Sequence, residues 1–288
     1  MDKVLIVGAS GLLGSSLSPY CTERGVRVVR GGFTAPEADI RFDVRDFAQT
    51  YAVLEEVQPD LIVNLTALTD VDLCEAQPHE AYLGNVRCVE SLCRWMAANG
   101  RKCFLIHIST DTVYDGVGPH AEPDIRLTSC YAFSKYASEL VALSVPSTIL
   151  RTTFFGRTLS NRRKSLSDWV VESLTHGVPV KAVRDVLFSP LSISSLVQYI
   201  HLCMMTRAEG VFNLGSHHGF SKAEFIFRLA SVLDLDTRLI SLADASQVFV
   251  KAYRSRDTRM DVKKFETTFG VVLPSLDSEI EWMRGQYA

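Results

Sequence analysis

Residues 3–14 read KVLIVGASGLLG, and this stretch decides the fold of the chain. Its first five residues form a continuous apolar run, which is typical of a strand buried on both faces. Three glycines follow at the start of a helical pattern. The first allows a sharp turn, the second lets the backbone approach a pyrophosphate, and the third lets helix and strand pack closely. Together with the free N–H groups at the helix N-terminus, they predict a dinucleotide-binding loop rather than an ordinary tight turn. The residues of the predicted loop are Gly8, Ser10, Gly11, Leu12, Leu13 and Gly14.

The first half of the chain continues with alternating strand and helix patterns. Because the helical stretches are long enough to act as crossovers, the strands are expected to be parallel, with helices on both faces of one sheet. The expected fold class is therefore α/β, with a doubly wound parallel sheet of the Rossmann type. The expected strands are Lys3–Val7, Val26–Arg30, Ala38–Phe42, Leu61–Leu65, Phe104–Ile108 and Thr148–Arg151. The expected helices are Ser10–Arg24, Asp46–Val57, Pro78–Ala98 and Ser129–Leu143.

The pattern changes beyond Arg151, where short strand and helix signals are mixed. These segments predict a smaller, mixed α/β lobe for the substrate, interleaved with the end of the main sheet. We expect the dinucleotide-binding domain to comprise residues 1–151 and returning segments near 178–210. The smaller lobe is expected to comprise about residues 152–177 and 211–288.

Composition restricts the class of protein further. Of the 288 residues, 47% are hydrophobic and 22% are charged, which is typical of a globular protein and excludes a disordered or collagenous chain. The net charge of −3 gives no broad basic surface, so nucleic acid is not an expected partner. The seven cysteines are scattered and form no CxxC pair, so neither a disulfide framework nor a metal site is expected. Because we find neither a signal peptide nor an apolar run long enough to span a bilayer, we expect a cytoplasmic protein with no membrane partner.

The end of the second expected strand bears on the choice of coenzyme. Sites for NAD usually carry an acid there that holds the ribose 2′-OH, but the segment VVRGG at 28–32 has none. Arg30 could meet a 2′-phosphate instead, which favours NADPH over NADH, although NADH stays possible and Arg30 could be an ordinary surface residue. Asp43 and Val44, after the third strand, are placed to contact the adenine. A turn aspartate is a nearly equal interpretation of Asp43.

A tyrosine and a lysine in the segment YAFSK indicate acid–base chemistry. Tyr131 and Lys135 are four residues apart, so a helix places both side chains on one face. A tyrosine has an ordinary pKa of about 10, and an adjacent ammonium lowers it by stabilising the anion. Thr110 supplies a hydroxyl at the end of the fifth strand, at the sheet edge where ligands of open α/β sheets bind. These three residues are the predicted catalytic group.

Motifs along nearly the whole chain resemble those of the extended short-chain dehydrogenase/reductase family. The more specific resemblance is to the dTDP-4-dehydrorhamnose reductases and related sugar-nucleotide-binding proteins. The motifs that carry it are GASGLLG (8–14), NLTALTDVDLCEAQP (64–78) followed by Asn85, STDTVYDG (109–116), YAFSK (131–135), LRTTFFG (150–156), FSPLS (188–192) and TRMDVKKFETTFGVVLP (258–274). The chain departs from the family pattern at Thr112, where an aromatic residue is typical, and at Phe154, where a tryptophan is usual.

The resemblance implies an NAD(P)-dependent oxidoreductase that transfers a hydride to C4 of a nucleotide-activated 4-keto-6-deoxy sugar. It implies that Tyr131 donates the proton, that Lys135 modulates Tyr131 and anchors the ribose, and that Thr110 hydrogen-bonds the carbonyl. The residues that it implies on the coenzyme side are Leu65, Thr66, Ala67 and Asn85, and those that it implies beside the sugar are Asp111 and Phe154.

Other interpretations stay open at this stage. Arg162 and Arg163 could grip a substrate diphosphate, because the arginine fork contacts two phosphate oxygens at once, but a solvated basic loop is about as good an interpretation. The alternative functions are a sugar-nucleotide epimerase and a non-catalytic NADP-binding regulatory subunit. The expected partner is a nucleotide-diphosphate sugar, and a homodimer is possible.

Overall fold

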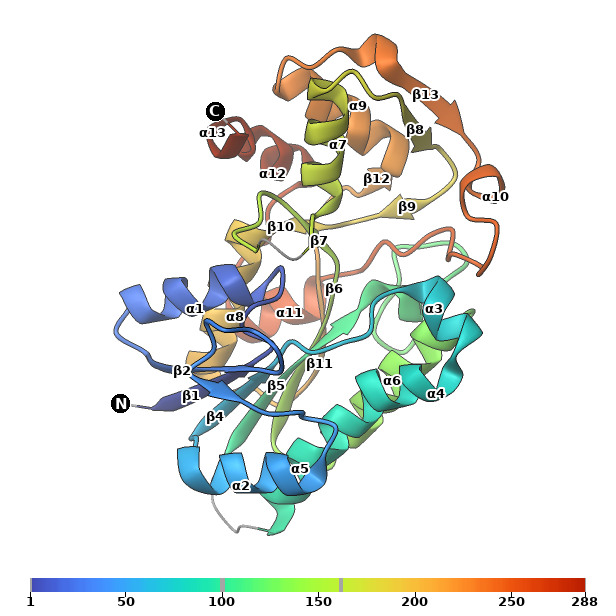
Figure 1. Ribbon diagram of the computed structural model, residues 1–288. Coiled ribbons are helices and arrows are strands. Elements are labelled where there is room, and N and C mark those ends of the chain that lie inside the picture. Colours follow the sequence, from blue (N-terminus) through green and yellow to red (C-terminus); the bar gives the residue numbers. More distant parts are fainter. Residues whose placement is uncertain (1, 99–101, 161–162, 288) are drawn as a thin grey trace. The chain divides into compact units, whose positions relative to one another are not determined.

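The computed structural model describes residues 2–98, 102–160 and 163–287. Its main sheet has seven strands in the order β11-β6-β5-β4-β1-β2-β3 (Figure 1). Strand β1 pairs in parallel with β2 and β4, and the pairs β2–β3 and β4–β5 are parallel too. The strands are β1 Lys3–Val7, β2 Arg27–Gly32, β3 Ile40–Arg41, β4 Leu61–Asn64, β5 Phe104–Thr110, β6 Ser147–Thr152 and β11 Gly210–Leu214. The expected α/β fold with a Rossmann-type parallel sheet is confirmed.

Helices cover both faces of this sheet (Figure 1). On one face α1 and α8 touch, with 5.8 Å between the ring centroids of Tyr20 and His201. On the other face α2, α5 and α6 share a core with the strands, in which Trp95 and Leu92 pack with Leu105. The apolar runs of the strands are buried on both sides for this reason. The helices are α1 Gly14–Glu23, α2 Phe47–Val57, α5 Cys88–Ala98, α6 Cys130–Ala142 and α8 Ile193–Thr206.

Two helices differ from their expected form. The helix expected from Ser10 begins only at Gly14, because the preceding residues form the glycine turn. The helix expected over Pro78–Ala98 consists of α4 Pro78–Ala81, a π-helical segment η1 Tyr82–Arg87, and α5. The π-helical segment contains Asn85, whose buried side chain bonds to a neighbouring loop. Such widened turns are frequent at functional sites.

The chain divides into two compact units. The first comprises residues 1–110, 129–150 and 197–211, and the second comprises residues 111–128, 151–196 and 212–288. These bounds differ from the expected ones in two places. Residues 111–128 belong to the second unit, and so does most of the segment expected to return near 178–210, because β8 pairs with β13 in the second unit.

Three two-stranded sheets and several helices form the second unit. Its core is aromatic, with the Phe225 ring packed edge-on against both Phe155 and Phe188. The sheets are β7 Phe154–Phe155 with β10 Leu191–Ser192, β9 Leu187–Phe188 with β12 Phe220–Ser221, and β8 Val180–Val183 with β13 Ile240–Ala243. The helices are α7 Leu166–Thr175, α9 Lys222–Val232, α10 Ala245–Val248, α11 Lys263–Phe269, α12 Leu276–Trp282 and α13 Arg284–Tyr287.

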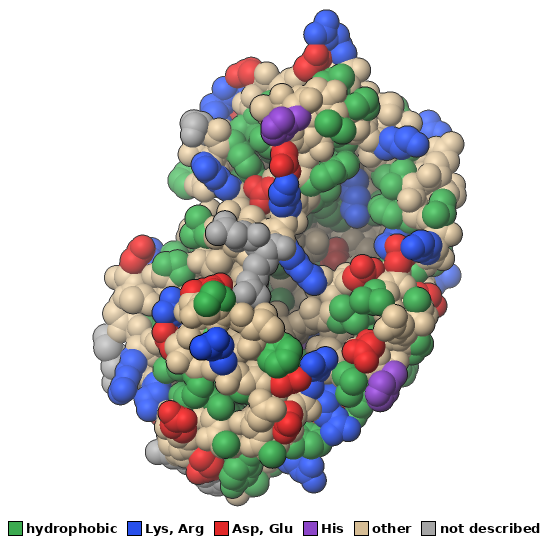
Figure 2. Space-filling model, in the orientation of Figure 1, with side chains coloured by type: hydrophobic (Ala, Val, Ile, Leu, Met, Phe, Trp, Pro, Cys, Tyr) green, Lys and Arg blue, Asp and Glu red, His purple; other side chains and the backbone are tan. Residues whose placement is uncertain are grey.

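The surface charge, the cysteines and the length of the helices bear on the expectations drawn from composition. On the face drawn in Figure 2, Lys and Arg side chains are interspersed with Asp and Glu. All seven cysteines are free thiols. Within the described ranges, no helix combines the length and the apolar character that crossing a bilayer requires.

Candidate active site

The glycine loop joins β1 to α1 in the tight form that its sequence predicts. Gly8 has a φ of +87°, which L-amino acids with side chains rarely adopt. Its N–H donates to the Gly31 carbonyl of β2 at 3.0 Å. A Cβ added at Gly14 would lie 2.4 Å from the Gly8 carbonyl oxygen, so helix and turn are in direct backbone contact there. A side chain at Gly14 would therefore prevent the close approach of α1 to the turn.

The end of β4 lies against the same loop. The backbone of Leu65 and Thr66 would be 3.3 Å from a Cβ added at Gly8. Leu65 N–H donates to the Val7 carbonyl at 2.9 Å, which continues the strand pairing to the sheet edge. Leu65, Thr66 and Ala67 are all half-buried. The structure thus brings together residues from the ends of β1 and β4 that are expected to contact the coenzyme.

Arg30 on β2 is engaged by an acid that the sequence analysis missed. Its guanidinium binds the Asp39 carboxylate, with Nη2 2.6 Å from Oδ1, and its backbone N–H donates to the same carboxylate at 2.8 Å. The hydrogen bond from Arg30 holds the pKa of Asp39 below its ordinary value. Both side chains are more than a third exposed, and exposed pairs contribute little to stability, so the pair can open for a ligand. No sequence signal marks Asp39, because it lies beyond the strand and reaches back to it.

The residues expected near the adenine have partners inside the protein. The Asp43 carboxylate binds Arg45 through two hydrogen bonds, of 2.9 Å from Nε and 2.7 Å from Nη2. It also accepts the Arg45 N–H at 3.0 Å, which is the pattern of a turn aspartate. The side chain of Val44 is buried in the core of the first unit. A contact of either residue with adenine stays a prediction.

Helix α6 holds Tyr131 and Lys135 one turn apart. Ser129 begins the helix as its N-cap, accepting from the Ala132 N–H at 3.2 Å. The Lys135 ammonium is buried and donates to the Ile108 carbonyl of β5 at 2.8 Å, two residues before Thr110. Burial lowers the pKa of Lys135 to about 8, while Cys88 and Glu139 oppose the shift. The tyrosine is buried against Cys74 and Ala81.

A buried polar network, not anticipated from the sequence, lies beneath these groups. Ser138 Oγ donates to the Lys135 carbonyl at 2.6 Å, so it must accept from His107 Nε2, which lies at 2.9 Å. His107 Nδ1 then accepts from the Asn64 amide at 3.2 Å. Burial holds the pKa of His107 well below its ordinary value, which agrees with a neutral ring. The amide oxygen of Asn64 in turn accepts from the Thr66 hydroxyl at 2.6 Å. The network therefore links α6 to the coenzyme edge of the sheet.

A carboxylate and a second amide fix the same helix. Ser109 Oγ donates to the buried Glu139 carboxylate on α6. The Asn85 amide donates to Ser134 Oγ at 2.8 Å and accepts the Leu68 N–H at 2.7 Å. In this structure Asn85 therefore joins the loop after β4 to α6. Direct contact of Asn85 with nicotinamide stays a prediction.

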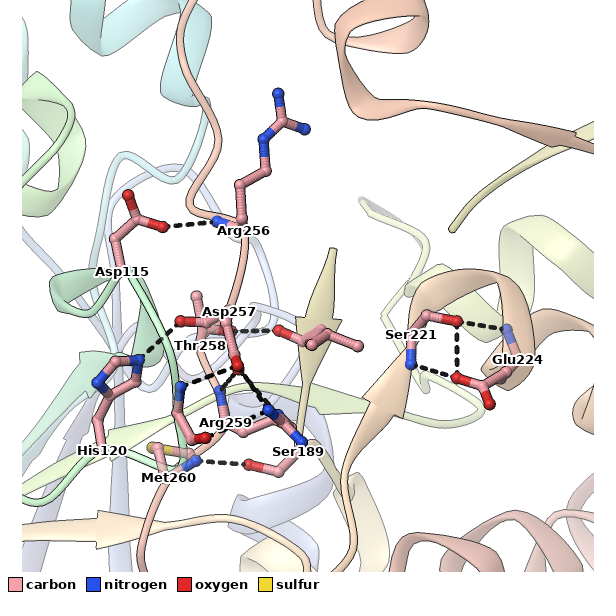
Figure 3. A network of polar contacts seen from close by, with 12 residues as sticks. Asp115, His120, Ser189, Ser221, Glu224, Arg256, Asp257, Thr258, Arg259 and Met260 are labelled. Atoms are coloured by element: carbon pink, nitrogen blue, oxygen red, sulfur yellow. Dashed lines mark hydrogen bonds and ion pairs between the residues drawn. The ribbon is translucent and has the colours of Figure 1, made fainter. Parts of the chain in front are cut away.

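The residues expected beside the sugar belong to the second unit. The buried Asp111 carboxylate accepts from Thr258 Oγ1 at 2.7 Å. Thr258 lies in the polar network drawn in Figure 3, next to Asp257. Phe154 is half-buried on β7, and Arg163 is exposed. Arg162 lies outside the described residues.

The fold and the first unit's geometry define a class of protein. A Rossmann-type sheet with an intact glycine loop, and a Tyr-x-x-x-Lys pair at the edge of that sheet, define a short-chain dehydrogenase/reductase-like dinucleotide-binding protein. The model of one family, the RmlD substrate binding domain, matches residues 2–287. The chain belongs to this family, which is the dTDP-4-dehydrorhamnose reductase-like branch of the extended short-chain dehydrogenases/reductases.

The relatives include reductases and one subunit of a different enzyme. A dTDP-4-dehydrorhamnose reductase of Sinorhizobium fredii is 33% identical over 253 residues, which is 81% of this chain and 82% of that protein. Subunit beta of methionine adenosyltransferase 2 of Rattus norvegicus is 25% identical over 92% of this chain and 82% of that protein. A dTDP-4-dehydrorhamnose reductase of Bacillus anthracis, solved in complex with NADP, superimposes with a TM-score of 0.87 at 20% identity and covers 98% of both chains. At that identity the last likeness shows the fold alone.

Proposed function

We propose that this protein reduces the C4 ketone of a nucleotide-activated 4-keto-6-deoxy sugar with NADPH. One observation carries the proposal: α6 holds Tyr131 and a buried Lys135 ammonium one turn apart, and the ammonium bonds the β5 carbonyl just before Thr110. The family, whose relatives include reductases of dTDP-4-dehydrorhamnose, supports the choice of substrate.

The glycine loop is the part of the chain that would hold the coenzyme. A Cβ at Gly14 would meet the Gly8 carbonyl at 2.4 Å, and this bare backbone suits a pyrophosphate at the N-terminus of α1. NADPH, when bound, supplies the hydride. Gly8, Gly11 and Gly14 would hold its pyrophosphate, and Lys135 would bind a ribose hydroxyl.

Tyr131 and Lys135 would handle the proton. As the ketone oxygen gains negative charge, the Tyr131 hydroxyl transfers its proton to that oxygen and becomes tyrosinate. Lys135, with a pKa of about 8, is mostly protonated at neutral pH and stabilises this anion. The Thr110 hydroxyl donates a hydrogen bond to the same ketone oxygen and so fixes its position. General acid catalysis of this kind typically contributes about 10²–10⁴-fold.

The proposal is tested by coenzyme oxidation. Purified protein is mixed with NADPH or NADH and a panel of nucleotide-linked 4-keto-6-deoxy sugars, and loss of the reduced nicotinamide absorbance is followed. We expect consumption of NADPH with at least one of these sugars and formation of the corresponding 4-hydroxy product. No consumption with any member of the panel, by protein that binds NADPH, would contradict the reductase function.

A role as a non-catalytic subunit is the second candidate. The similarity to subunit beta of methionine adenosyltransferase 2 over 92% of this chain favours it. The retained Tyr131 and Lys135 favour the reductase, because a binding subunit needs no proton donor. The same assay separates the two, since a subunit would bind NADPH and show no turnover with the sugars.

A further inference from the structure

A histidine is fully buried in the first unit, on an interior strand of the main sheet. His107 lies on β5, directly opposite Asn64 of the neighbouring strand β4. Its two ring nitrogens have partners on two different elements. Nε2 lies 2.9 Å from Ser138 Oγ on α6, and Nδ1 lies 3.2 Å from the Asn64 amide nitrogen. Because burying a polar ring is costly unless both nitrogens are satisfied, the polarity of these two bonds matters.

A backbone carbonyl decides the polarity at the α6 end. Ser138 Oγ is 2.6 Å from the Lys135 carbonyl oxygen, which can only accept a hydrogen bond. The single proton of the serine hydroxyl is therefore used there. Ser138 must then accept from His107, so the Nε2 atom of the ring carries a proton.

A backbone N–H decides the polarity at the β4 end. The Asn64 amide oxygen is 3.2 Å from the Thr66 backbone nitrogen, which can only donate. The amide oxygen therefore faces Thr66, and the amide NH₂ faces His107 and donates to Nδ1. Both ends require the same state of the ring, which is neutral with its proton on Nε2. Burial and the Lys135 ammonium both lower the pKa of His107, in agreement with this state.

The two ends of this hydrogen-bonded chain are expected coenzyme contacts. Thr66 lies beside the glycine loop, with its Cγ2 and backbone nitrogen 3.3 Å from a Cβ added at Gly8. Lys135 carries the ammonium that would bind a ribose hydroxyl. The three side chains between them, Asn64, His107 and Ser138, are fully buried. A chain with one allowed polarity keeps its two ends at a fixed separation before any ligand binds, and such preorganisation favours affinity.

We propose that His107 is a positioning residue that holds Lys135 and Thr66 at the separation that the coenzyme requires. It acts through Ser138 on one side and through Asn64 on the other. The inference deepens the proposed function and rests on it for the identity of the coenzyme.

Nuclear magnetic resonance tests the predicted state of the ring directly. Long-range ¹H–¹⁵N spectra of the full chain distinguish a charged imidazole from each of its two neutral tautomers. The His107 signal is identified by its absence from the His107→Gln variant. We expect a neutral ring with the proton on Nε2 at neutral pH, with and without NADPH. A charged ring, or a proton on Nδ1, would overturn the proposal.

Variants that break the chain test its effect on the coenzyme. His107→Leu removes both links and should weaken NADPH binding about tenfold, which is the size expected for a lost buried hydrogen bond. His107→Gln keeps a donor near the place of Nε2 and should recover part of this loss. Ser138→Ala removes a single hydroxyl, so it keeps the test valid even where His107→Leu does not fold. The double variant should bind no more weakly than His107→Leu, because both changes break the same chain.

A second buried serine provides the matched control. Ser91 Oγ on α5 donates to the Arg87 carbonyl at 3.0 Å, as Ser138 Oγ does to the Lys135 carbonyl. Ser91→Ala should lower the thermal midpoint about as much as Ser138→Ala and leave NADPH affinity unchanged. If the His107 and Ser138 variants also lower only the thermal midpoint, the role of the chain is purely structural and the proposal is wrong.

Turnover separates this proposal from the proposed function. With a sugar that is reduced, NADPH deuterated at the transferred position should show a larger isotope effect in His107→Leu than in the wild type, because a displaced coenzyme slows hydride transfer. If the wild-type protein reduces none of the sugars but NADPH affinity falls in the variants, the positioning role stands and the reductase function fails. If the wild-type protein reduces a sugar and the variants keep its NADPH affinity and isotope effect, the reductase function stands and the positioning role fails.

Discussion

A single hydroxyl group should decide catalysis. In Tyr131→Phe the ring stays buried against Cys74 and Ala81, but the hydroxyl that we propose as the proton donor is gone. We expect turnover to fall at least 10²-fold or so while NADPH affinity changes little. Tyr136→Phe, which removes a hydroxyl from the same helix, is the control and should keep wild-type turnover. A Tyr131→Phe enzyme with most of its activity would show that the proton comes from another group.

The alkaline limit of the reaction should follow Lys135. Its pKa of about 8 means that the ammonium is lost above pH 8, and the rate should fall there because tyrosinate is no longer stabilised. Three groups face it: Cys88 on α5 and Glu139 on α6 raise the pKa of Lys135, while Lys135 lowers that of His107 on β5.

Because the Glu139 carboxylate favours the ammonium, Glu139→Gln should move the alkaline limb to lower pH. Steady-state rates across the pH range measure this shift, and Glu172→Gln, an exposed acid of the second unit, should leave the limb in place. A limb that stays at the same pH in Glu139→Gln would contradict this account.

Coenzyme preference should also depend on one side chain. We expect the wild-type protein to bind NADPH more tightly than NADH, because the Arg30 guanidinium can leave its exposed pair with Asp39 for a 2′-phosphate. Arg30→Ala should remove this preference, and Asp39→Asn should increase it by releasing the guanidinium. Arg27→Ala, an exposed arginine of the same strand, is the control. Fluorescence titration with both coenzymes measures the preference, and equal affinities unaffected by Arg30→Ala would disprove it.

At the scale of elements, the contact between turn and helix at Gly14 has no room for a side chain. The added methyl group of Gly14→Ala would lie 2.4 Å from the Gly8 carbonyl oxygen and 2.6 Å from Ala9 Cα. Because both are backbone atoms, the turn and α1 must separate, which should cost about 1–3 kcal/mol and weaken NADPH binding. Urea unfolding and coenzyme titration measure the two effects. Gly285→Ala is the matched control, since a Cβ there meets nothing within 4 Å.

The elements that could be predicted are those marked by a pattern of neighbouring residues, such as an apolar run or a helix N-cap. The apolar runs of Lys3–Val7 and Phe104–Ile108 identify strands. The helix expected from Asp46 begins there, because the Asp46 side chain caps α2 and accepts from the Ala48 and Gln49 N–H groups. The sequence analysis missed Asp39 beside Arg30 and the π-helical turn around Asn85. Each depends on contacts between residues distant in the sequence or on a side chain that reaches back, which no local pattern contains.

At the scale of the whole molecule, the first unit depends on segments that return late in the chain. Strand β11 pairs with β6 at one edge of the main sheet. Helix α8 packs against α1, with Cys21 Sγ 3.8 Å from Met204 Sδ. A fragment of residues 1–150 lacks both, so its outer strand and the apolar side of α1 are exposed. We expect this fragment to melt without a cooperative transition and to bind an apolar dye. Cooperative melting with NADPH affinity equal to that of the full chain would contradict this.

The interleaving of the two units has a consequence for biosynthesis. The first unit closes only with residues 197–211, and the second unit begins at residue 111 and continues to the end of the chain. The first unit is therefore complete only after residue 211 has been synthesised, when parts of the second unit have been made and residues 212–288 have not. The strands β1 to β6 emerge early and must wait for Gly210–Leu214 to complete their sheet. During that interval the nascent polypeptide exposes an unpaired strand edge, which makes this stage of synthesis prone to aggregation.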